Sequence, residues 1–510
     1  MKKWPKYPII YEINTCVWLG ELSRKYERPV TLATVPEEEW EQITSSGFDV
    51  VWFMGVWERS PAGIAISMRN DGLLKDFKRA LPDFAAEDNL GSPYCVRRYV
   101  VDKHLGGPQG LATARKTLAE SGLRVILDFV PNHVAPDHPW AKSHPEYFVQ
   151  GNADDLKNDS ASFIEVEGTV FALGRDPFFP AWPDVLQLNA FQPGLRQAVI
   201  ETISEIAEQC DGMRCDMSML VLNSIFERTW GARAGSRPST DYWATVIKTI
   251  KSKYDGFRFI AEAYWDLEWE LQKQGFDFCY DKQLYDRMEH ADTETVRQHL
   301  LADWADQHKM VRFLENHDEP RAAATFPDGK GRAAAVAILT LLGARLLHEG
   351  QFEGRKVRLP VFLGRRPKEP IDNDLAAFYA RLLKEVDHDV FRNGYWRLCE
   401  RNGWPDNQSF LNILAWCWAK DGARYLVVIN FSDQPAQSRV RVPLDELRGK
   451  TWRLNDLLGA ETYDRSGDEM RDSGLYVELK PWQCHLFKLS LVRVKPGTAN
   501  ISDLQPALVR

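Results

Sequence analysis

Three acidic residues stand at the ends of three apolar segments that are typical of β-strands. Asp216 ends the run Gly-Met-Arg-Cys-Asp, Glu262 ends Phe-Arg-Phe-Ile-Ala-Glu, and Asp318 ends a run that begins Val-Arg-Phe-Leu. Carboxyl groups are poor material for a core, because burying an unpaired charge is costly. They can act as proton donor, base and nucleophile, and the catalytic groups of a β/α barrel lie at the C-terminal ends of its strands. We therefore expect these three carboxyl groups to share one catalytic centre.

Alternating strand-like and helix-like segments predict the fold that would position these groups. Helices are expected at Pro36–Ser45, Gly110–Ser121, Gly194–Gln209 and Arg332–Leu342. Eight such β/α units predict an α/β fold of the (β/α)8 TIM-barrel type. The eight predicted strands are Ile9–Asn14, Val50–Met54, Val125–Val130, Gly212–Asp216, Arg258–Glu262, Phe276–Tyr280, Val311–Asn316 and Ala344–His348.

Two further parts are expected around the barrel. The third and fourth strands lie roughly 80 residues apart, too far for an ordinary connection, so Ala135–Leu188 is predicted to form a small inserted subdomain. The segment Gly55–Leu90 is predicted to be a long loop beside the cleft. After about Tyr395, short alternating runs predict a C-terminal antiparallel β-sandwich. The expected division is a barrel of residues 1–134 and 189–392, an insertion of 135–188, a sandwich of 393–492 and a loosely held tail of 493–510.

Composition limits the class of protein. With 510 residues, the chain is expected to form two or three domains. A net charge of −8 without a basic run argues against a nucleic-acid partner. No apolar run reaches the ~18 residues that span a membrane, and the N-terminal run is too short and polar for a signal peptide. Eight cysteines without a Cys-x-x-Cys pair argue against zinc and suggest free thiols in a reducing cytoplasm.

Four segments, in chain order, resemble the four signature regions of the α-amylase superfamily, glycoside hydrolase family 13. They are 128–133 (Asp-Phe-Val-Pro-Asn-His), 212–216, 261–264 (Ala-Glu-Ala-Tyr) and 313–318 (Phe-Leu-Glu-Asn-His-Asp). The run Val-Leu-Gln-Leu-Asn at 185–189 resembles the motif that ends the superfamily's inserted subdomain. The resemblance implies a TIM barrel with this insertion and a C-terminal β-domain.

The resemblance also implies roles for the three carboxyl groups. Asp216 would be the nucleophile and Glu262 the general acid, later the base, with retention of configuration through a covalent glycosyl-enzyme. Retaining enzymes hold the two carboxyl groups about 5–5.5 Å apart. Glu262 should then have a raised pKa, with Tyr264 and Trp265 as apolar surroundings. Asp318 would grip sugar hydroxyls in the transition state; the alternative is a helix N-cap.

Five other residues match positions that the superfamily uses around the bound sugar. Arg214 lies two residues before Asp216, so on a strand the two side chains face the same side. Arg214 would keep the Asp216 carboxylate ionised and correctly oriented. The alternative is an ordinary ion pair without a catalytic role. His133 and His317 match hydroxyl-binding histidines, although either would also suit a core. Tyr94 resembles a tyrosine that stacks on the sugar, and Asp128 a residue that supports the site.

Several departures limit what the resemblance implies. Many starch-degrading members carry Lys-His where this chain has Met219 and Leu220. In those members the histidine takes part in a calcium site together with the asparagine that matches Asn132. Because Leu220 cannot replace the histidine, a calcium site is doubtful in this chain. Gly91 replaces an aspartate of many exo-acting glucosidases. The arginines of Leu363–Pro367 suggest either a structural loop or contacts to hydroxyls or phosphate. No organic cofactor is expected, and the oligomeric state stays open.

The expected substrate is an oligosaccharide or α-glucan. A retaining hydrolase of α-glucosidic bonds is the first hypothesis. An α-glucan transglycosylase or a disaccharide-forming isomerase would use the same residues and is the alternative. A non-catalytic scaffold or binding protein belongs to a different class, and the presence of all three carboxyl groups opposes it. The 18 tryptophans suggest packing first and flat platforms for sugar rings second.

Overall fold

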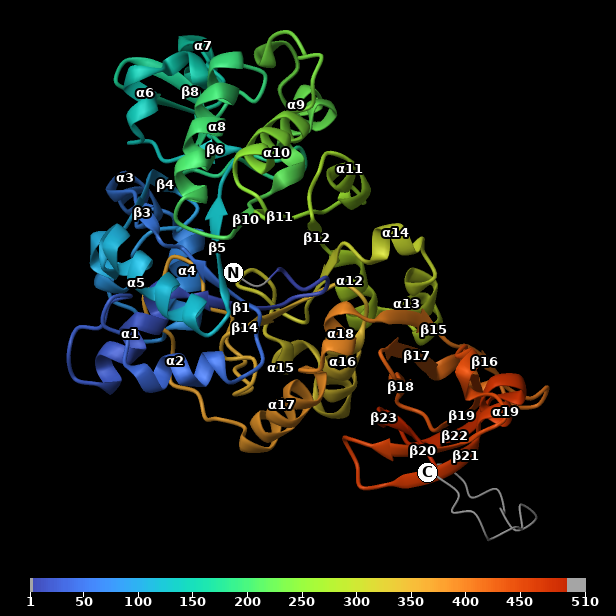
Figure 1. The fold of residues 1–510 in the computed structure, drawn as a ribbon. Coiled ribbons are helices and arrows are strands. Elements are labelled where there is room, and N and C mark those ends of the chain that lie inside the picture. The colour runs from blue at the N-terminus through green and yellow to red at the C-terminus, as the bar shows by residue number, and fades with distance from the viewer. Residues whose placement is uncertain (1–2, 493–510) are drawn as a thin grey trace, which may run out of the picture.

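The computed structural model describes residues 3–492, and its centre is a closed barrel of eight parallel strands (Figure 1). Each strand pairs with the next in chain order, and the last strand pairs with the first. The predicted TIM barrel is confirmed. Its strands are β1 (Ile9–Asn14), β2 (Val50–Met54), β5 (Arg124–Phe129), β10 (Gly212–Cys215), β11 (Arg258–Ala261), β12 (Phe278–Tyr280), β13 (Met310–Arg312) and β14 (Ala344–His348).

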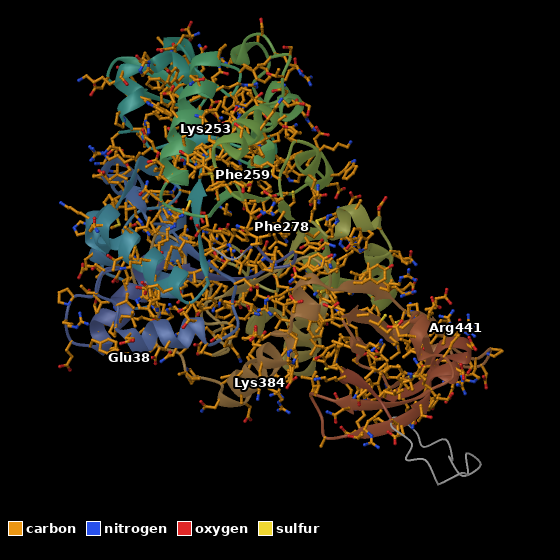
Figure 2. The ribbon with its side chains drawn as sticks, viewed as in Figure 1. Glu38, Lys253, Phe259, Phe278, Lys384 and Arg441 are labelled. Atoms are coloured by element: carbon orange, nitrogen blue, oxygen red, sulfur yellow. The ribbon has the colours of Figure 1, made fainter. Side chains whose placement is uncertain are left out.

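The barrel strands are buried on both faces, as parallel strands between an inner core and an outer ring of helices must be. All six side chains of β5 are buried, and its sequence is a nearly continuous apolar run. Helix α8 (Pro193–Ala207) begins with a proline in its first turn and buries Leu195, Val199 and Ile203 at helical spacing. Figure 2 labels the buried Phe259 and Phe278 on barrel strands and the exposed Lys253 at the end of α10.

Helices surround the barrel where the chain passes between strands. Three of the predicted helices occur with slightly different ends, as α2 (Glu37–Thr44), α5 (Gly107–Glu120) and α16 (Asp328–Thr340). The others are α1 (Thr15–Lys25), α9 (Asn223–Trp230), α10 (Tyr242–Lys253), α11 (Glu268–Lys273), α12 (Lys282–His290), α13 (Thr293–Leu300), α14 (Trp304–Gln307), α15 (Ala322–Thr325), α17 (Asn373–Val386) and α18 (Asp389–Asn393).

The segment after β2 is more ordered than the loop predicted at Gly55–Leu90. It contains β3 (Trp57–Arg59), which pairs with β4 (Val96–Val101), and the helices α3 (Pro61–Ser67) and α4 (Asp71–Ala80). Side-chain caps explain the helices, because Ser60 accepts from the backbone of Gly63 and Asn70 from that of Leu73. The prediction of a loop was wrong because these short caps were overlooked.

The insertion follows β5 and lies over the end of the barrel to which that strand points (Figure 1). It opens and closes on a short ladder between β6 (His133–Val134) and β9 (Leu186–Gln187). Between them lie α6 (Pro139–Ser143), α7 (Ala153–Asn158) and the hairpin of β7 (Phe163–Val166) and β8 (Thr169–Ala172). The insertion therefore stands beside the C-terminal ends of the barrel strands.

Two antiparallel sheets form the C-terminal domain and enclose a core of their own, as predicted. The larger sheet has the order β15 (Tyr395–Leu398), β17 (Ile413–Lys420), β18 (Ala423–Asn430), β23 (Cys484–Leu491), β20 (Thr451–Asp456) and β21 (Thr462–Ser466). The smaller sheet has the order β16 (Glu400–Asn402), β19 (Ala436–Arg441) and β22 (Leu475–Leu479).

Strand β17 belongs to two cores at once. Ile413, Ala415 and Cys417 point into the sandwich, whereas Trp416 and Trp418 pack with the barrel. The indole nitrogens of both tryptophans bond to Thr340, at 3.2 Å to its hydroxyl and 2.7 Å to its carbonyl oxygen. This strand therefore fixes the C-terminal domain to helix α16.

Three remaining sequence predictions concern thiols, membranes and the tail. All eight cysteines are free, and Cys215 and Cys279 are buried. No helix within residues 3–492 has the length and apolar character needed to cross a membrane. The tail expected to be loosely held lies outside the described residues, and the boundaries given for the four parts of the chain stay predictions.

Candidate active site

Arg214 lies at the centre of a cluster of carboxyl groups at the C-terminal ends of β5, β10 and β11. Its Nη1 donates to Oδ1 of Asp216 at 2.9 Å, and its Nη2 lies 2.8 Å from Oε2 of Glu262. Oδ1 of Asp128 is 3.5 Å from Nη1. The guanidinium is 1% exposed and packs against the rings of Trp52, Tyr94 and Tyr280. One planar cation thus holds Asp216 and Glu262 side by side.

Glu262 has two further contacts that fix its carboxyl group. The backbone N–H of Met217 donates to Oε2 at 2.6 Å, and the hydroxyl of Tyr264 donates to Oε1 at 2.8 Å. Met217 adopts a left-handed conformation with φ of 40°, which is uncommon for a residue with a side chain. Trp265 and its neighbour Asp266 do the same, with φ of 62° and 61°. Strained backbone therefore follows both carboxyl groups, as is frequent at functional sites.

The pKa values of the two carboxyl groups differ in the direction that acid catalysis needs. Burial raises the pKa of Glu262 to about 7, although Arg214 opposes the rise. Burial also raises the pKa of Asp216 to about 6, again against the effect of Arg214. Near neutral pH, the proton that the pair binds therefore resides mainly on Glu262.

Asp318 lies at the open side of this cluster, with a side chain that is 47% exposed. Burial by itself would raise the pKa of Asp318. The neighbouring His317 has the larger opposite effect, and the pKa falls to about 2. Nε2 of His317 is 3.0 Å from Oδ2 of Asp318 and 2.7 Å from the hydroxyl of Tyr94. The rings of Tyr94 and His317 stack at 5.3 Å. Asp318 is therefore an ionised acceptor in the cleft.

Sequence reasoning missed Glu12, which is fully buried in β1 and contacts Nδ1 of His317. Burial lowers the pKa of His317, but Asp318 and Glu12 on its two sides raise it well above the ordinary value. Glu12 of β1 and the adjacent residues His317 and Asp318 thus form a row of alternating charges. The available signal was a glutamate within the apolar run Ile-Ile-Tyr-Glu-Ile.

We expect Glu12→Gln to weaken substrate binding in a pH-dependent way. Without the Glu12 charge, the pKa of His317 falls. At a pH above this lowered pKa, His317 is neutral and its ion pair with Asp318 is lost. At pH 8, kcat/KM should drop roughly tenfold. This factor corresponds to about 1.4 kcal/mol, near the lower end of the free energy that one hydrogen bond to a charged group contributes. Near pH 5.5, where an ordinary histidine is charged anyway, the loss should shrink.

Steady-state kinetics at the two pH values tests this positioning role of Glu12. Glu12→Asp keeps the charge and should recover part of the lost activity. An equal loss at pH 5.5 and pH 8 would indicate a merely structural role.

Asp128 and His133 flank the cluster on the side of β5. Asp128 accepts from Nε1 of Trp52 at 3.2 Å and from the backbone of Gly55 at 3.3 Å, so it supports the wall behind Arg214. The ring of His133 lies 5.1 Å from that of Trp182 in the insertion. Burial lowers the pKa of His133 to about 3, and a neutral imidazole suits contact with a hydroxyl.

The residues at the superfamily's calcium position do not fit a calcium ion. The amide nitrogen of Gln187 donates to the backbone and side-chain oxygens of Asn132, both at 2.9 Å. Those oxygens therefore face a donor, whereas calcium requires six to eight oxygen ligands. The nearby Leu220 is buried and apolar. Among residues 3–492, no group of three or more histidine, cysteine or acidic side chains is arranged to hold a metal.

The arginines after β14 are already paired with acids. Arg366 binds both carboxylate oxygens of Glu349, at 2.6 and 2.7 Å. Arg365 binds Asp88 at 2.6 and 2.8 Å. These bonds favour the structural reading of this loop over a phosphate site.

Comparison with known families agrees with this fold. A (β/α)8 barrel with acidic groups at its strand ends is the architecture of a large class of glycoside-processing enzymes. The profile described as "Alpha amylase, catalytic domain" matches residues 87–416, about two thirds of the chain. The chain therefore belongs to the α-amylase superfamily, glycoside hydrolase family 13.

Individual relatives are distant and have different activities in their names. α-Amylase MalA of Haloarcula japonica is 23% identical over 85% of this chain and 56% of its own length. An α-1,4-glucan:maltose-1-phosphate maltosyltransferase of Rhodospirillum rubrum is 24% identical over 54% of this chain and 35% of its own. The chain thus spans only about half, or a third, of these curated relatives.

Solved structures show the same fold at still lower identity. The maltogenic α-amylase AmyB of Thermotoga neapolitana superposes with a TM-score of 0.68 at 19% identity. The match covers 96% of this chain and 99% of that one. At this identity the likeness establishes the architecture of barrel and C-terminal domain, and the activity has to be argued from the site.

Proposed function

We propose that this protein is a retaining enzyme that cleaves α-glucosidic bonds of oligosaccharides or α-glucans through a covalent glycosyl-enzyme. The observation that carries the proposal is the single guanidinium of Arg214, which contacts Asp216 and Glu262 through its two terminal nitrogens. Such close carboxyl groups favour the retaining arrangement, since an inverting pair leaves room for a water molecule between them.

In the first step, Glu262 donates its proton to the leaving oxygen while Asp216 attacks the anomeric carbon. The raised pKa of Glu262 supplies the proton near neutral pH. The C–O bond breaks, a bond to Asp216 forms, and the leaving sugar departs as an alcohol. Asp318, held by His317, accepts hydroxyl hydrogens of the distorted sugar, and Tyr94 and His133 flank its ring.

In the second step, the Glu262 carboxylate removes a proton from the incoming acceptor, which displaces Asp216 from the anomeric carbon. Water as acceptor gives hydrolysis, and a sugar hydroxyl gives transfer. The residues of both steps are the same, and the relatives named above include a hydrolase and a transferase. Hydrolysis is the proposed activity, with transglycosylation as the second candidate.

Product analysis distinguishes these two outcomes. Purified protein is incubated with maltose, maltoheptaose, trehalose, sucrose and glycogen, with Asp216→Asn as the control. Shorter products with rising reducing ends indicate hydrolysis. Longer products, or isomers formed at constant reducing ends, indicate transfer. Turnover that persists unchanged in Asp216→Asn would overturn the proposed site.

The pH dependence of kcat/KM should be bell-shaped. Asp216 must be ionised, so activity should fall as pH drops through about 6, the value to which burial raises its pKa. Glu262 must be protonated, so activity should fall as pH rises through about 7. Because the two groups interact, the limbs report the pair. Initial rates from pH 4 to 9 test this, and a rate that keeps rising above pH 8 would contradict the assignment of Glu262.

A further inference from the structure

Tyr264 stands two residues after Glu262, in the loop that follows β11. Its hydroxyl donates to Oε1 of Glu262 at 2.8 Å. The backbone here forms a tight turn, because the N–H of Leu267 donates to the carbonyl oxygen of Tyr264 at 3.3 Å. The two residues inside the turn are Trp265 and Asp266, the left-handed pair described above. The loop therefore fixes the hydroxyl beside the proposed acid and base.

The other carboxyl oxygen of Glu262 already faces two donors. The backbone N–H of Met217 donates to Oε2 at 2.6 Å, and Nη2 of Arg214 lies 2.8 Å from the same atom. A backbone N–H and a guanidinium can only donate, so a proton on Oε2 would point at another hydrogen. Oε1 has a different neighbour, because a tyrosine hydroxyl can donate or accept. The acid proton of Glu262 therefore belongs on Oε1, beside Tyr264.

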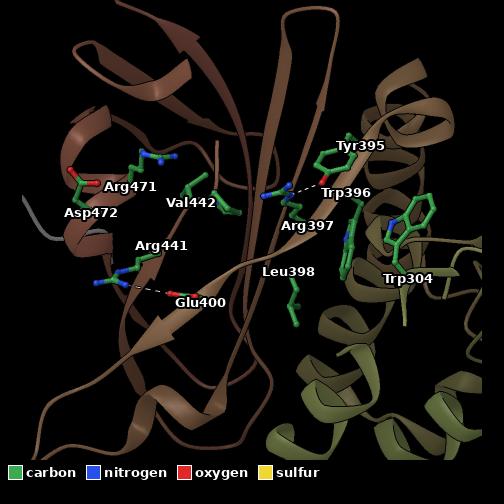
Figure 3. Close-up of a pocket in the computed structure, with 11 residues that line it drawn as sticks. Trp304, Tyr395, Trp396, Arg397, Leu398, Glu400, Arg441, Val442, Arg471 and Asp472 are labelled. Atoms are coloured by element: carbon green, nitrogen blue, oxygen red, sulfur yellow. Dashed lines mark hydrogen bonds and ion pairs between the residues drawn. The ribbon is translucent and has the colours of Figure 1, made fainter. Parts of the chain in front are cut away.

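Tyrosine hydroxyls act in both directions elsewhere in this molecule. The hydroxyl of Tyr395 accepts a hydrogen bond of 2.6 Å from a guanidinium, in the hollow between α14 and β15 (Figure 3). The hydroxyl of Tyr26, at the end of α1, donates to Oε1 of Glu39 at 2.8 Å. By the same rule, Tyr264 donates to an ionised Glu262 and accepts from a protonated one. Its hydroxyl hydrogen thus turns each time the acid loses or regains its proton.

Charged and titratable groups from other strands also act on Glu262. Burial raises its pKa most, Arg214 opposes the rise, and Asp216 and Asp318 add to it. Tyr280 of β12 faces the same charge, and burial raises the pKa of its hydroxyl well above the ordinary value, so that it stays un-ionised. Against this background, a hydroxyl that donates to the Glu262 carboxylate lowers the pKa of that group, because the bond favours the charged form.

Tyr264 itself does not ionise near neutral pH. Burial raises the pKa of its hydroxyl well above the ordinary value, and the charges of Glu262, Asp318 and Glu319 add to the rise. A tyrosine that keeps its proton can always donate, so it bonds to Glu262 whenever that carboxyl group is ionised. A change in pH dependence on removal of the hydroxyl must then come from the carboxyl groups.

We propose that Tyr264 is a positioning residue of the catalytic acid and base: its hydroxyl keeps the acid proton on Oε1 of Glu262 and stabilises the carboxylate that proton transfer leaves. The inference rests on the proposed function for the reaction itself. In the first step, the proton moves from Oε1 to the leaving oxygen as the C–O bond breaks, and the hydroxyl turns from acceptor to donor. In the second step, the proton of the incoming acceptor arrives at Oε1, and the hydroxyl turns back. Tyr264 itself gains and loses no proton.

Tyr264→Phe removes the hydroxyl and keeps the ring. Without this donor the pKa of Glu262 rises, so the alkaline limb of kcat/KM on maltoheptaose should move up by about one pH unit, a modest value for one hydrogen bond to a charged group. The acidic limb should stay in place, because it follows Asp216 while Glu262 is still protonated. Initial rates from pH 4 to 9 measure both limbs.

A ring-fluorinated tyrosine at position 264 should give the opposite change. Fluorine makes the phenolic hydroxyl a stronger donor, which stabilises the carboxylate and should move the alkaline limb down. This replacement preserves the shape of the side chain, so it decides the question even where Tyr264→Phe folds poorly. Tyr26→Phe is the matched control, since it deletes a hydroxyl that also donates to a glutamate at 2.8 Å. Its limbs and rates should equal those of the parent.

Infrared difference spectra give a second measurement that needs no turnover. The C=O band of the protonated Glu262 carboxyl group is assigned by its loss in Glu262→Gln. The disappearance of this band with rising pH reports the pKa of the group. Its midpoint should lie about one pH unit higher in Tyr264→Phe than in the parent.

An alkaline limb and an infrared midpoint that stay unchanged in Tyr264→Phe would overturn the role of the hydroxyl, even if the rate falls, because a purely structural role of the ring predicts that result. Shifts of the same sign in Tyr264→Phe and in the fluorinated protein would do so as well. Failure of the proposed function has a different signature, which is turnover that survives Asp216→Asn. In that case the infrared midpoint still tests the bond between Tyr264 and Glu262.

Discussion

Asp216→Asn should lower kcat on maltoheptaose by about 10⁴-fold or more, because the amide cannot form the covalent glycosyl-enzyme. The structure gives no reason for unfolding, since the change is nearly isosteric and Arg214 keeps its contact with Glu262. Circular dichroism and the melting temperature should therefore stay close to those of the parent. Glu201→Gln, an amide change at an exposed position of α8, is the matched control and should keep full activity.

Glu262→Gln should show a different pattern if its role is acid and base. On maltoheptaose, kcat should fall by several orders of magnitude, as for Asp216→Asn. On α-glucosyl fluoride, the leaving fluoride needs little protonation, so the first step should remain fast and the glycosyl-enzyme should accumulate. Mass spectrometry of the quenched protein detects this adduct. Equal losses on both substrates, without an adduct, would contradict the acid/base assignment.

Replacing Arg214 by methionine should destabilise the fold strongly. The substitution leaves Asp216, Glu262 and Asp128 buried without their shared cation, and breaking a buried pair in this way costs about 3–5 kcal/mol. Urea unfolding at pH 7 measures the free energy of unfolding. Arg214→Lys keeps a positive charge but loses the planar fork, so its loss should be smaller.

The pH dependence of this loss has a definite sign. Without Arg214, the pKa values of the three carboxyl groups rise further above their unfolded values. The native state then binds more protons than the unfolded state between about pH 4 and neutrality, so its stability falls as pH rises. The deficit against the parent should be smallest near pH 4 and largest above pH 7. A deficit that grows on acidification would contradict this account.

Much of the fold could be predicted because the barrel strands are local, apolar and regular. The ends of β1, β2 and β14 agree with the prediction, since each is a run of buried residues bounded by polar ones. Strand β13 ends at Arg312 instead of Asn316, because the chain leaves the ladder before the residues that face the cleft. The C-terminal domain could be predicted only as short alternating runs, because many side chains of β15, β16, β20 and β21 are polar or exposed.

The candidate site, too, could be predicted only in part from the sequence. Asp216, Glu262 and Arg214 could be picked out because each lies near a strand end and within a recognisable segment. Glu12 could not be paired with His317 from sequence, because the two are 305 residues apart and meet only when β1 closes the barrel. The left-handed turn at Met217, which aims an N–H at Glu262, has no local glycine to announce it.

The double membership of β17 bears on how such a protein can change over evolutionary time. One face of this strand completes the sandwich, and the other fills the surface of α16 with two tryptophans bonded to Thr340. A lineage could not discard the C-terminal domain, or exchange it for another, without exposing part of the barrel's own interior. We therefore expect the barrel and the C-terminal domain to be kept together, because separating them would uncover Trp416 and Trp418.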